Sequence, residues 1–201
     1  MSEEKKLSKE EILEKYRDNN GEIDWETFSY REKLSEEFIE KHTEDVDWSG
    51  ISSCQTLSED FIERHAENEK VDWYFISKFQ TLSEDFIEKH AEDVNWDYIS
   101  HYQTLSEDFI EKHSNEVNWN LISECQKLSK DFIKKHIDKI NVEIIASRPE
   151  YSKEFIDELR ELRHDNKNKI INDTKLPTNV VSPQDRSGIL DKVVNKEELK
   201  R

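Results

Sequence analysis

Residues 82–104 read LSEDFIEKHAEDVNWDYISHYQT, and near-copies of this stretch run through the middle of the chain. The steps between successive copies are 23, 25, 23 and 23 residues, from starts at Leu34, Leu57, Leu82, Leu105 and Leu128. A mostly polar unit of this length cannot bury its own apolar face, so each copy needs neighbours. The repeat therefore predicts a solenoid.

Each unit carries two helix starts. Ser83 is suited to an N-cap with acidic residues after it, and Leu82 and Ile87 stand at hydrophobic-staple spacing. Asn95 repeats this pattern, with Val94 and Ile99 around it. Because both patterns recur in the other copies, the sequence predicts an all-α fold, an αα-solenoid of about six two-helix repeats with a C-terminal extension.

The periodicity also predicts the boundaries. We expect a repeat array over residues 1–164 and a linker with a short helix over 165–201, with array units near 7–33, 34–56, 57–81, 82–104, 105–127 and 128–150 and a final helix over 151–164. In the first, worn unit, Ser8 and Glu11 have capping-box spacing and Gly21 suits a helix C-cap.

Two segments depart from the repeat. The unit over 57–81 has two additional residues near Glu69 and Lys70, which should extend a loop without breaking the stack. Residues 172–187 are polar and aperiodic and indicate a linker, and residues 188–201 have the pattern of a short amphipathic helix. Docking of that helix on the array or on a partner, and a mobile tail, both stay open.

The chain is strongly acidic, with a net charge of −17. Such a charge repels nucleic-acid backbones and anionic membranes, and it attracts basic proteins. The simpler interpretation is that the charge keeps the array in solution. The first residues lack the apolar core of a signal peptide, and no apolar run is long enough to span a membrane. We therefore expect a cytoplasmic protein.

Cys54 and Cys125 occupy the same repeat position three units apart, where Phe79 and Tyr102 stand in the units between. If a unit advances about 10 Å, the two cysteines are about 30 Å apart, too far for a disulfide. We therefore interpret them as small apolar residues.

Several residue types recur once in each unit, and we assign them structural roles. The tryptophans and phenylalanines are expected in the core between units, with each indole N–H bonded to a turn carbonyl. One histidine per unit, about 10 Å from the next, cannot converge on a metal ion, so we expect the rings to bond free carbonyls at helix ends. The glutamines are expected to bond turn backbone in their own or the next unit. These residues are Trp25, Trp48, Trp73, Trp96, Trp119, Phe38, Phe61, Phe86, Phe109, Phe132, His42, His65, His90, His113, His136, Gln55, Gln80, Gln103 and Gln126.

Paired glutamates on the first helix of four units predict an acidic ridge, which ends where Lys130 and Lys134 take the same places. A solvated face is one interpretation. Docking of a basic protein, or imitation of nucleic-acid phosphates, is the other. The ridge consists of Glu36, Glu40, Glu59, Glu63, Glu84, Glu88, Glu107 and Glu111.

A second stripe, on the second helix of each unit, varies while its surroundings stay constant. A varied stripe on a constant frame suits a partner-binding surface, and drift on an exposed face explains it equally well. Its residues are Ser49, Tyr74, Asp97 and Asn120, and four positions later Ser53, Lys78, His101 and Glu124.

The unit Leu-Ser-Glu-Asp-Phe-Ile-Glu-Lys-His-x-x-x-Val-Asn-Trp-x-x-Ile-Ser-x-x-Gln resembles an uncharacterised helical repeat of proteins from giant DNA viruses and large phages. The resemblance covers residues 7–157. It implies a viral or phage origin and action inside the host cell, and it supplies no functional residues.

The sequence contains no Gly-rich phosphate loop, no nucleophile elbow and no metalloprotease motif. We therefore predict no catalytic residues, no cofactor and no metal site. The predicted function is a non-enzymatic protein–protein interaction scaffold, a viral or phage factor whose host protein partner has a basic surface, with no direct nucleic-acid or membrane binding. The alternative is an acidic inhibitor that imitates nucleic acid and blocks a host defence nuclease or another DNA- or RNA-binding protein. The oligomeric state stays open.

Overall fold

The computed structural model describes residues 8–66 and 70–174, with side chains described up to Lys169. Apart from one isolated bridge between Arg17 and Ile23, the regular structure in these residues is helical. The elements are α1 (Lys9–Leu13), the 3-10 turn η1 (Glu14–Tyr16), α2 (Trp25–Arg31), α3 (Glu36–Lys41), α4 (Trp48–Cys54), α5 (Glu59–Ala66), α6 (Trp73–Phe79), α7 (Glu84–Lys89), α8 (Trp96–Tyr102), α9 (Glu107–Lys112), α10 (Trp119–Cys125), α11 (Lys130–Lys135), α12 (Val142–Ala146) and α13 (Lys153–Thr174).

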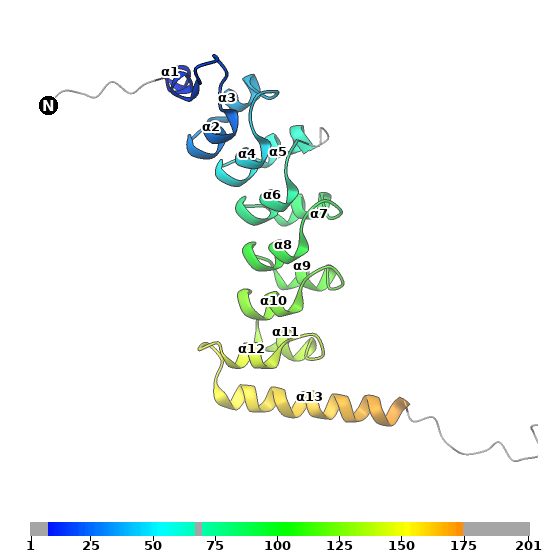
Figure 1. Cartoon of the computed structure of the whole chain (residues 1–201). Coiled ribbons are helices and arrows are strands. Elements are labelled where there is room, and N and C mark those ends of the chain that lie inside the picture. The colour runs from blue at the N-terminus through cyan, green and yellow to red at the C-terminus, as the bar shows by residue number, and fades with distance from the viewer. Residues whose placement is uncertain (1–7, 67–69, 175–201) are drawn as a thin grey trace, which may run out of the picture. The chain divides into compact units, whose positions relative to one another are not determined.

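The helices up to Leu159 belong to one compact unit, in which they form two rows (Figure 1). The even-numbered helices α2 to α12 follow one another in chain order along one row, and contacts join each of them to the next. The odd-numbered helices α3 to α11 form the other row. This arrangement confirms the predicted αα-solenoid. The described part of the second compact unit, from Arg160 onward, continues helix α13 to Thr174.

The predicted helix starts are confirmed. At the start of each odd-numbered helix from α3 to α13 a serine hydroxyl accepts a hydrogen bond from the backbone N–H of the phenylalanine three residues later, as Ser83 does from Phe86 at 3.2 Å. Asp or Asn does the same for the even-numbered helices, as Asn95 does from Tyr98 at 3.1 Å. These helices are six to eight residues long between α3 and α11, so the caps satisfy a large share of their free N–H groups.

The core lies between the two rows and between successive units. Two isoleucines per unit are completely buried, one in each helix, as Ile87 and Ile99 are. Leu82 and Val94, the other members of the predicted staples, are buried too, and so is Phe86. Since each unit contributes the same small set of apolar side chains, the core repeats along the stack with a constant width.

The tryptophans are half-buried, which corrects the expectation that they lie hidden between units. Each one starts an even-numbered helix at the rim of the core, so one part of the indole faces solvent. The other part packs on the phenylalanine and histidine of the following unit, as Trp96 does on Phe109 and His113. The indole N–H of Trp96 donates to the Ala91 carbonyl at 3.0 Å, a turn bond of the expected kind, and Trp48 and Trp119 do likewise.

The ends of the array differ from the prediction. The capping box of Ser8 and Glu11 is present. Gly21, in contrast, is no helix C-cap, because α1 ends through η1 and Gly21 follows in a separate turn, with φ of +87°. Helix α13 continues past residue 164 to Thr174, since neither glycine nor proline occurs before Pro177 to stop it.

Two predictions concern residues outside the described ranges. The extended loop near Glu69 falls largely on residues 67–69, although α5 does run to Ala66. The tail helix over 188–201, and the linker beyond Thr174, also lie outside the described residues.

Candidate functional site

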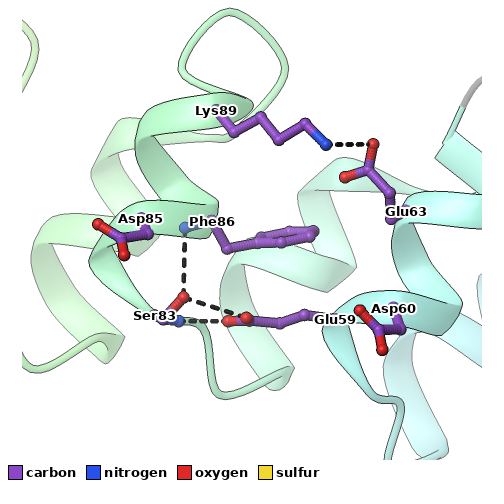
Figure 2. Close-up of a pocket in the computed structure, with 7 residues that line it drawn as sticks. All are labelled: Glu59, Asp60, Glu63, Ser83, Asp85, Phe86 and Lys89. Atoms are coloured by element: carbon purple, nitrogen blue, oxygen red, sulfur yellow. Dashed lines mark hydrogen bonds and ion pairs between the residues drawn. The ribbon is translucent and has the colours of Figure 1, made fainter.

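The first glutamate of each ridge pair caps the next unit. The Glu59 carboxylate accepts hydrogen bonds from the Ser83 backbone N–H at 2.5 Å and from the Ser83 hydroxyl at 3.1 Å (Figure 2). Glu84 bonds the same two groups of Ser106. These carboxylates therefore lie at the N-terminus of the following odd-numbered helix, where a negative charge is stabilising. The same contact to the backbone is made by Glu36 and Glu107.

The second glutamate of each pair forms an ion pair with the next unit. Glu63 contacts the Lys89 amine at 2.7 Å and His90 Nε2 at 2.7 Å. The hydrogen bond from Lys89 is the main reason that the pKa of Glu63 lies below its ordinary value. Equivalent pairs are Glu40 with His65, Glu88 with Lys112 and His113, and Glu111 with Lys135. The ridge glutamates thus bond successive units together, while the side chains of the second glutamates stay partly exposed.

A shallow hollow lies between α5 and α7, with a volume of about 350 Å³. Figure 2 shows how its walls are used: Glu59 points to Ser83, and Glu63 points to Lys89 across the opening. A similar hollow lies between α7 and α9. In the first hollow Glu59 bonds Ser83 and Glu63 bonds Lys89, and the second hollow repeats both pairs. The hollows therefore repeat with the fold and mark no particular site.

The ridge stops before the unit over 128–150 because the last junction has the opposite polarity. Lys134, at the place of Glu111, forms an ion pair of 2.6 Å with Glu158 of α13, which stands at the place of Lys135. Lys130 places its amine 5.1 Å from the centre of the Phe155 ring. The reversed charges in the sequence therefore mark which helix packs against the unit over 128–150.

Reversing one charge tests this junction. The Lys134→Glu variant should lower the free energy of unfolding by about 1 kcal/mol, because two carboxylates would then face each other at a partly exposed pair. Adding Glu158→Lys should restore most of the loss. Urea unfolding of the two variants measures both effects. A double variant no more stable than Lys134→Glu alone would contradict the pairing.

The histidines are structural, but not in the predicted way. Their rings pack between the tryptophan of the preceding unit and the phenylalanine of their own helix, as His113 does between Trp96 and Phe109. The Nε2 atoms of His65, His90 and His113 bond glutamates and not helix-end carbonyls. At His136 the corresponding Glu111 binds Lys135, and burial lowers the pKa of His136.

The glutamines join three segments of backbone. Gln103 is buried, accepts a hydrogen bond from the Leu82 N–H at 3.0 Å, and donates to the carbonyls of Ser77 and Gln80 at 3.1 and 2.8 Å. Gln55, Gln80 and Gln126 repeat this pattern. The bond to the glutamine's own unit agrees with the prediction, whereas the other two bonds reach the preceding unit and not the next one. In the last unit Arg148 donates to the two equivalent carbonyls.

A second buried polar series was missed in the sequence. The hydroxyl of Ser77 is fully buried and accepts a hydrogen bond from the Asn95 N–H of the next unit at 2.9 Å. Its equivalents do the same to the next Asp or Asn cap. A signal was present, because serine follows a buried apolar residue in each of these helices, Phe28 in α2 and an isoleucine in the others. The other members are Ser29, Ser52, Ser100 and Ser123.

The predicted stripe on the even-numbered helices divides into small polar ends and a bulky middle. On α4, the Ser53 hydroxyl donates to the Ser49 carbonyl at 2.7 Å. Asp97 accepts from Asn118 at 2.8 Å and Asn120 from Asn141 at 2.9 Å. These contacts also join successive units, and Glu124 is exposed. The stripe is therefore not a uniform surface.

The middle of the stripe is an exposed cluster of aromatic rings on α6 and α8, here named the aromatic face: Tyr74, Phe75, Phe79, Tyr98 and Tyr102. The exposed fractions are 47% for Tyr74, 50% for Phe79 and 49% for Tyr102. The rings of Tyr74 and Tyr98 meet edge to face, with centroids 4.6 Å apart, and the Tyr98 hydroxyl donates to that of Tyr74. Rings of this size are usually buried, so their exposure needs a reason.

Two basic side chains accompany these rings. The amine of Lys78 lies 4.9 Å from the centre of Phe79 and 5.4 Å from that of Tyr98. His101 packs on Tyr102 with centroids 4.2 Å apart, and its Nδ1 lies 3.4 Å from the Cys125 sulfur. Both cysteines are free and exposed, and burial of part of the side chain raises the pKa of Cys125.

The stripe from the sequence contained Tyr74, Lys78 and His101 but omitted Phe79 and Tyr102. In other units Cys54 and Cys125 occupy the same repeat position, and we interpreted these cysteines as small apolar residues. The replacement of cysteine by the large rings of Phe79 and Tyr102 in two neighbouring units was a sequence signal that could have revealed the aromatic face.

The hydrogen bond between Tyr98 and Tyr74 predicts that Tyr98 loses its proton at a higher pH than an ordinary tyrosine. It raises the pKa of Tyr98 to about 12. Since the neutral form donates, its contribution to stability is complete below the ordinary value of 10.0 and disappears as the pH rises through about 12. Tyr74→Phe removes the acceptor and should return the pKa of Tyr98 toward 10.0. Carbon-13 NMR of the Tyr98 ring measures it, and titration of the unaltered protein near the ordinary value would contradict the bond.

Within residues 8–66 and 70–174, no three His, Cys, Asp or Glu side chains are grouped so as to hold a metal ion. No helix in the described part of the chain is both long and apolar enough to cross a membrane. No family model, curated protein or solved structure matches the chain.

Proposed function

We propose that the chain is a non-enzymatic protein–protein interaction scaffold and that the aromatic face is its binding surface. The observation that carries this proposal is the exposure of Tyr74, Phe79 and Tyr102 on two neighbouring helices. Elsewhere in the array the repeated phenylalanines are buried, so these rings are not required by the packing of units.

The chemistry of the rings favours a protein partner. Tyrosine and phenylalanine supply a large apolar area at a small cost in side-chain entropy, and tyrosine adds a hydroxyl for polar contacts. The neighbouring helices α4 and α10 carry small or polar residues at the corresponding places, among them Ser53, Cys54 and Asn120. A partner would therefore meet a raised cluster of rings with a polar rim, which is the composition of an interface centre.

The inhibitor that imitates nucleic acid receives less support. Its candidate surface was the acidic ridge, and all eight ridge glutamates bond groups of the following unit. A viral or phage factor acting on a host protein stays part of the proposal, on the resemblance of the repeat alone.

Affinity capture tests the proposal with matched variants. The protein is used as bait in lysate of its native cells, beside a Tyr74→Ala/Phe79→Ala/Tyr102→Ala variant. The control is Asp60→Asn/Asp85→Asn/Asp108→Asn, which alters three exposed carboxylates of the other row. We expect the aromatic variant to lose its partner while the control retains it. Partner loss in the control and retention in the aromatic variant would overturn the proposal.

A further inference from the structure

The rings of the aromatic face already bind a cation within the chain. The Lys78 amine lies over Phe79 and Tyr98, at distances where a positive charge is attracted to the face of a ring. None of the ion pairs found among the described residues includes Lys78. The electron-rich rings are thus its principal partners.

The charge around the aromatic face is suited to a further positive group. Asp97 lies next to Tyr98 on α8 and is exposed, and Glu124 is exposed on α10. The other titratable side chains on α8 are His101 and the tyrosines Tyr98 and Tyr102. Across the whole chain the net charge of −17 attracts cations over longer distances.

We propose that the aromatic face binds an arginine side chain carried by a basic segment of the partner protein. The inference rests on the proposed function and names the partner's chemistry. The guanidinium would stack on the exposed ring of Tyr74 or Tyr102, and Asp97 would supply the opposite charge. Arginine suits such a site better than lysine, because its planar group stacks on rings and is more weakly hydrated.

Replacing Lys78 tests this inference, because the affinity for arginine should change in a known direction. A resident amine occupies ring area and repels an arriving cation, so removing it should strengthen binding of arginine. The Lys78→Gln variant should bind an arginine peptide about two- to fivefold more tightly. A carboxylate ligand would respond in the opposite direction.

The experiment follows NMR signals of the tyrosine rings while the full-length protein is titrated with the peptides (Gly-Arg)4, (Gly-Lys)4 and (Gly-Glu)4. We expect (Gly-Arg)4 to shift the signals of Tyr74, Tyr98 and Tyr102 saturably, and more strongly than (Gly-Lys)4. Asp97→Asn keeps a carbonyl oxygen for the bond to Asn118 but loses the charge, and it should weaken binding about two- to fivefold.

Three outcomes would overturn the inference: signals that move on the ridge helices and not on the rings, equal binding of (Gly-Lys)4, or weaker binding in Lys78→Gln. None of them removes the proposed function, which fails when partner capture no longer depends on Tyr74, Phe79 and Tyr102.

Discussion

Replacing Gln103 by alanine is expected to lower the free energy of unfolding by about 3–5 kcal/mol. Its amide joins the Leu82 N–H with the carbonyls of Ser77 and Gln80, and the side chain is only 6% exposed. Alanine would leave these three backbone groups without their partner and would open a cavity. Each buried polar group left unpaired costs about 1–3 kcal/mol.

Two further variants separate the causes. Gln103→Met fills nearly the same volume but cannot form the three bonds, so it should lose almost as much stability as alanine. Thr104→Ala, at the exposed neighbouring position, should change stability by less than about 0.5 kcal/mol. Urea unfolding followed by circular dichroism measures all three. A methionine variant as stable as the unaltered protein would show that the bonds contribute little.

Phe61→Ala is expected to lower the free energy of unfolding by a similar amount, about 3–5 kcal/mol. The ring is completely buried and packs on Trp48 of the preceding unit and on His65 of its own helix. In a stack where each unit contacts only its neighbours, the loss falls on one junction. We therefore also expect the units on either side to unfold less cooperatively.

Phe79→Ala is the matched control, because the same side chain is removed from a position that is 50% exposed. Its loss should be below about 1 kcal/mol, since little packing is removed. Thermal unfolding of both variants makes the comparison. Equal losses for Phe61 and Phe79 would contradict the division between a structural core and an exposed binding face.

Local features of the fold were predictable from the sequence. The caps at Ser83 and Asn95, with the staples around them, depend on residues within five positions of each other. The 23-residue period then predicted the stack, because a unit with so few apolar residues needs neighbours to bury them. The length of α13 was underestimated, since the repeat ends before the helix does.

The contacts between units were not predictable in the same way. The 23-residue repeat places Glu59 and Ser83 in adjacent units. Whether they form a hydrogen bond depends on how far one unit is rotated relative to the next. For this reason the ridge glutamates were interpreted only as a charged surface, and the bonds of Gln103 to the preceding unit were not predicted. The reversal of charge at Lys134 was noticed in the sequence, and Glu158 supplies its explanation.

The aromatic face was predicted in part. A stripe that varies between units was recognised, and Tyr74 belongs to it. Phe79 and Tyr102 were omitted because their position was judged from the cysteines that share it. Exposure depends on the whole neighbourhood of a side chain, and an aromatic residue in a short helix gives no sign by itself of which way it faces.

Hydrogen exchange at the Leu82 and Leu105 amides tests most directly whether buried side chains bond successive units together. Both amides lie in connections outside the helices, where exchange is ordinarily fast, and their acceptors are the side-chain oxygens of Gln103 and Gln126, at 3.0 and 3.1 Å. We predict that they exchange as slowly as the amides of the buried isoleucines. Exchange at the rate of an exposed loop would contradict the stacked arrangement, and with it the distinction between side chains that bond the units and rings that remain for a partner.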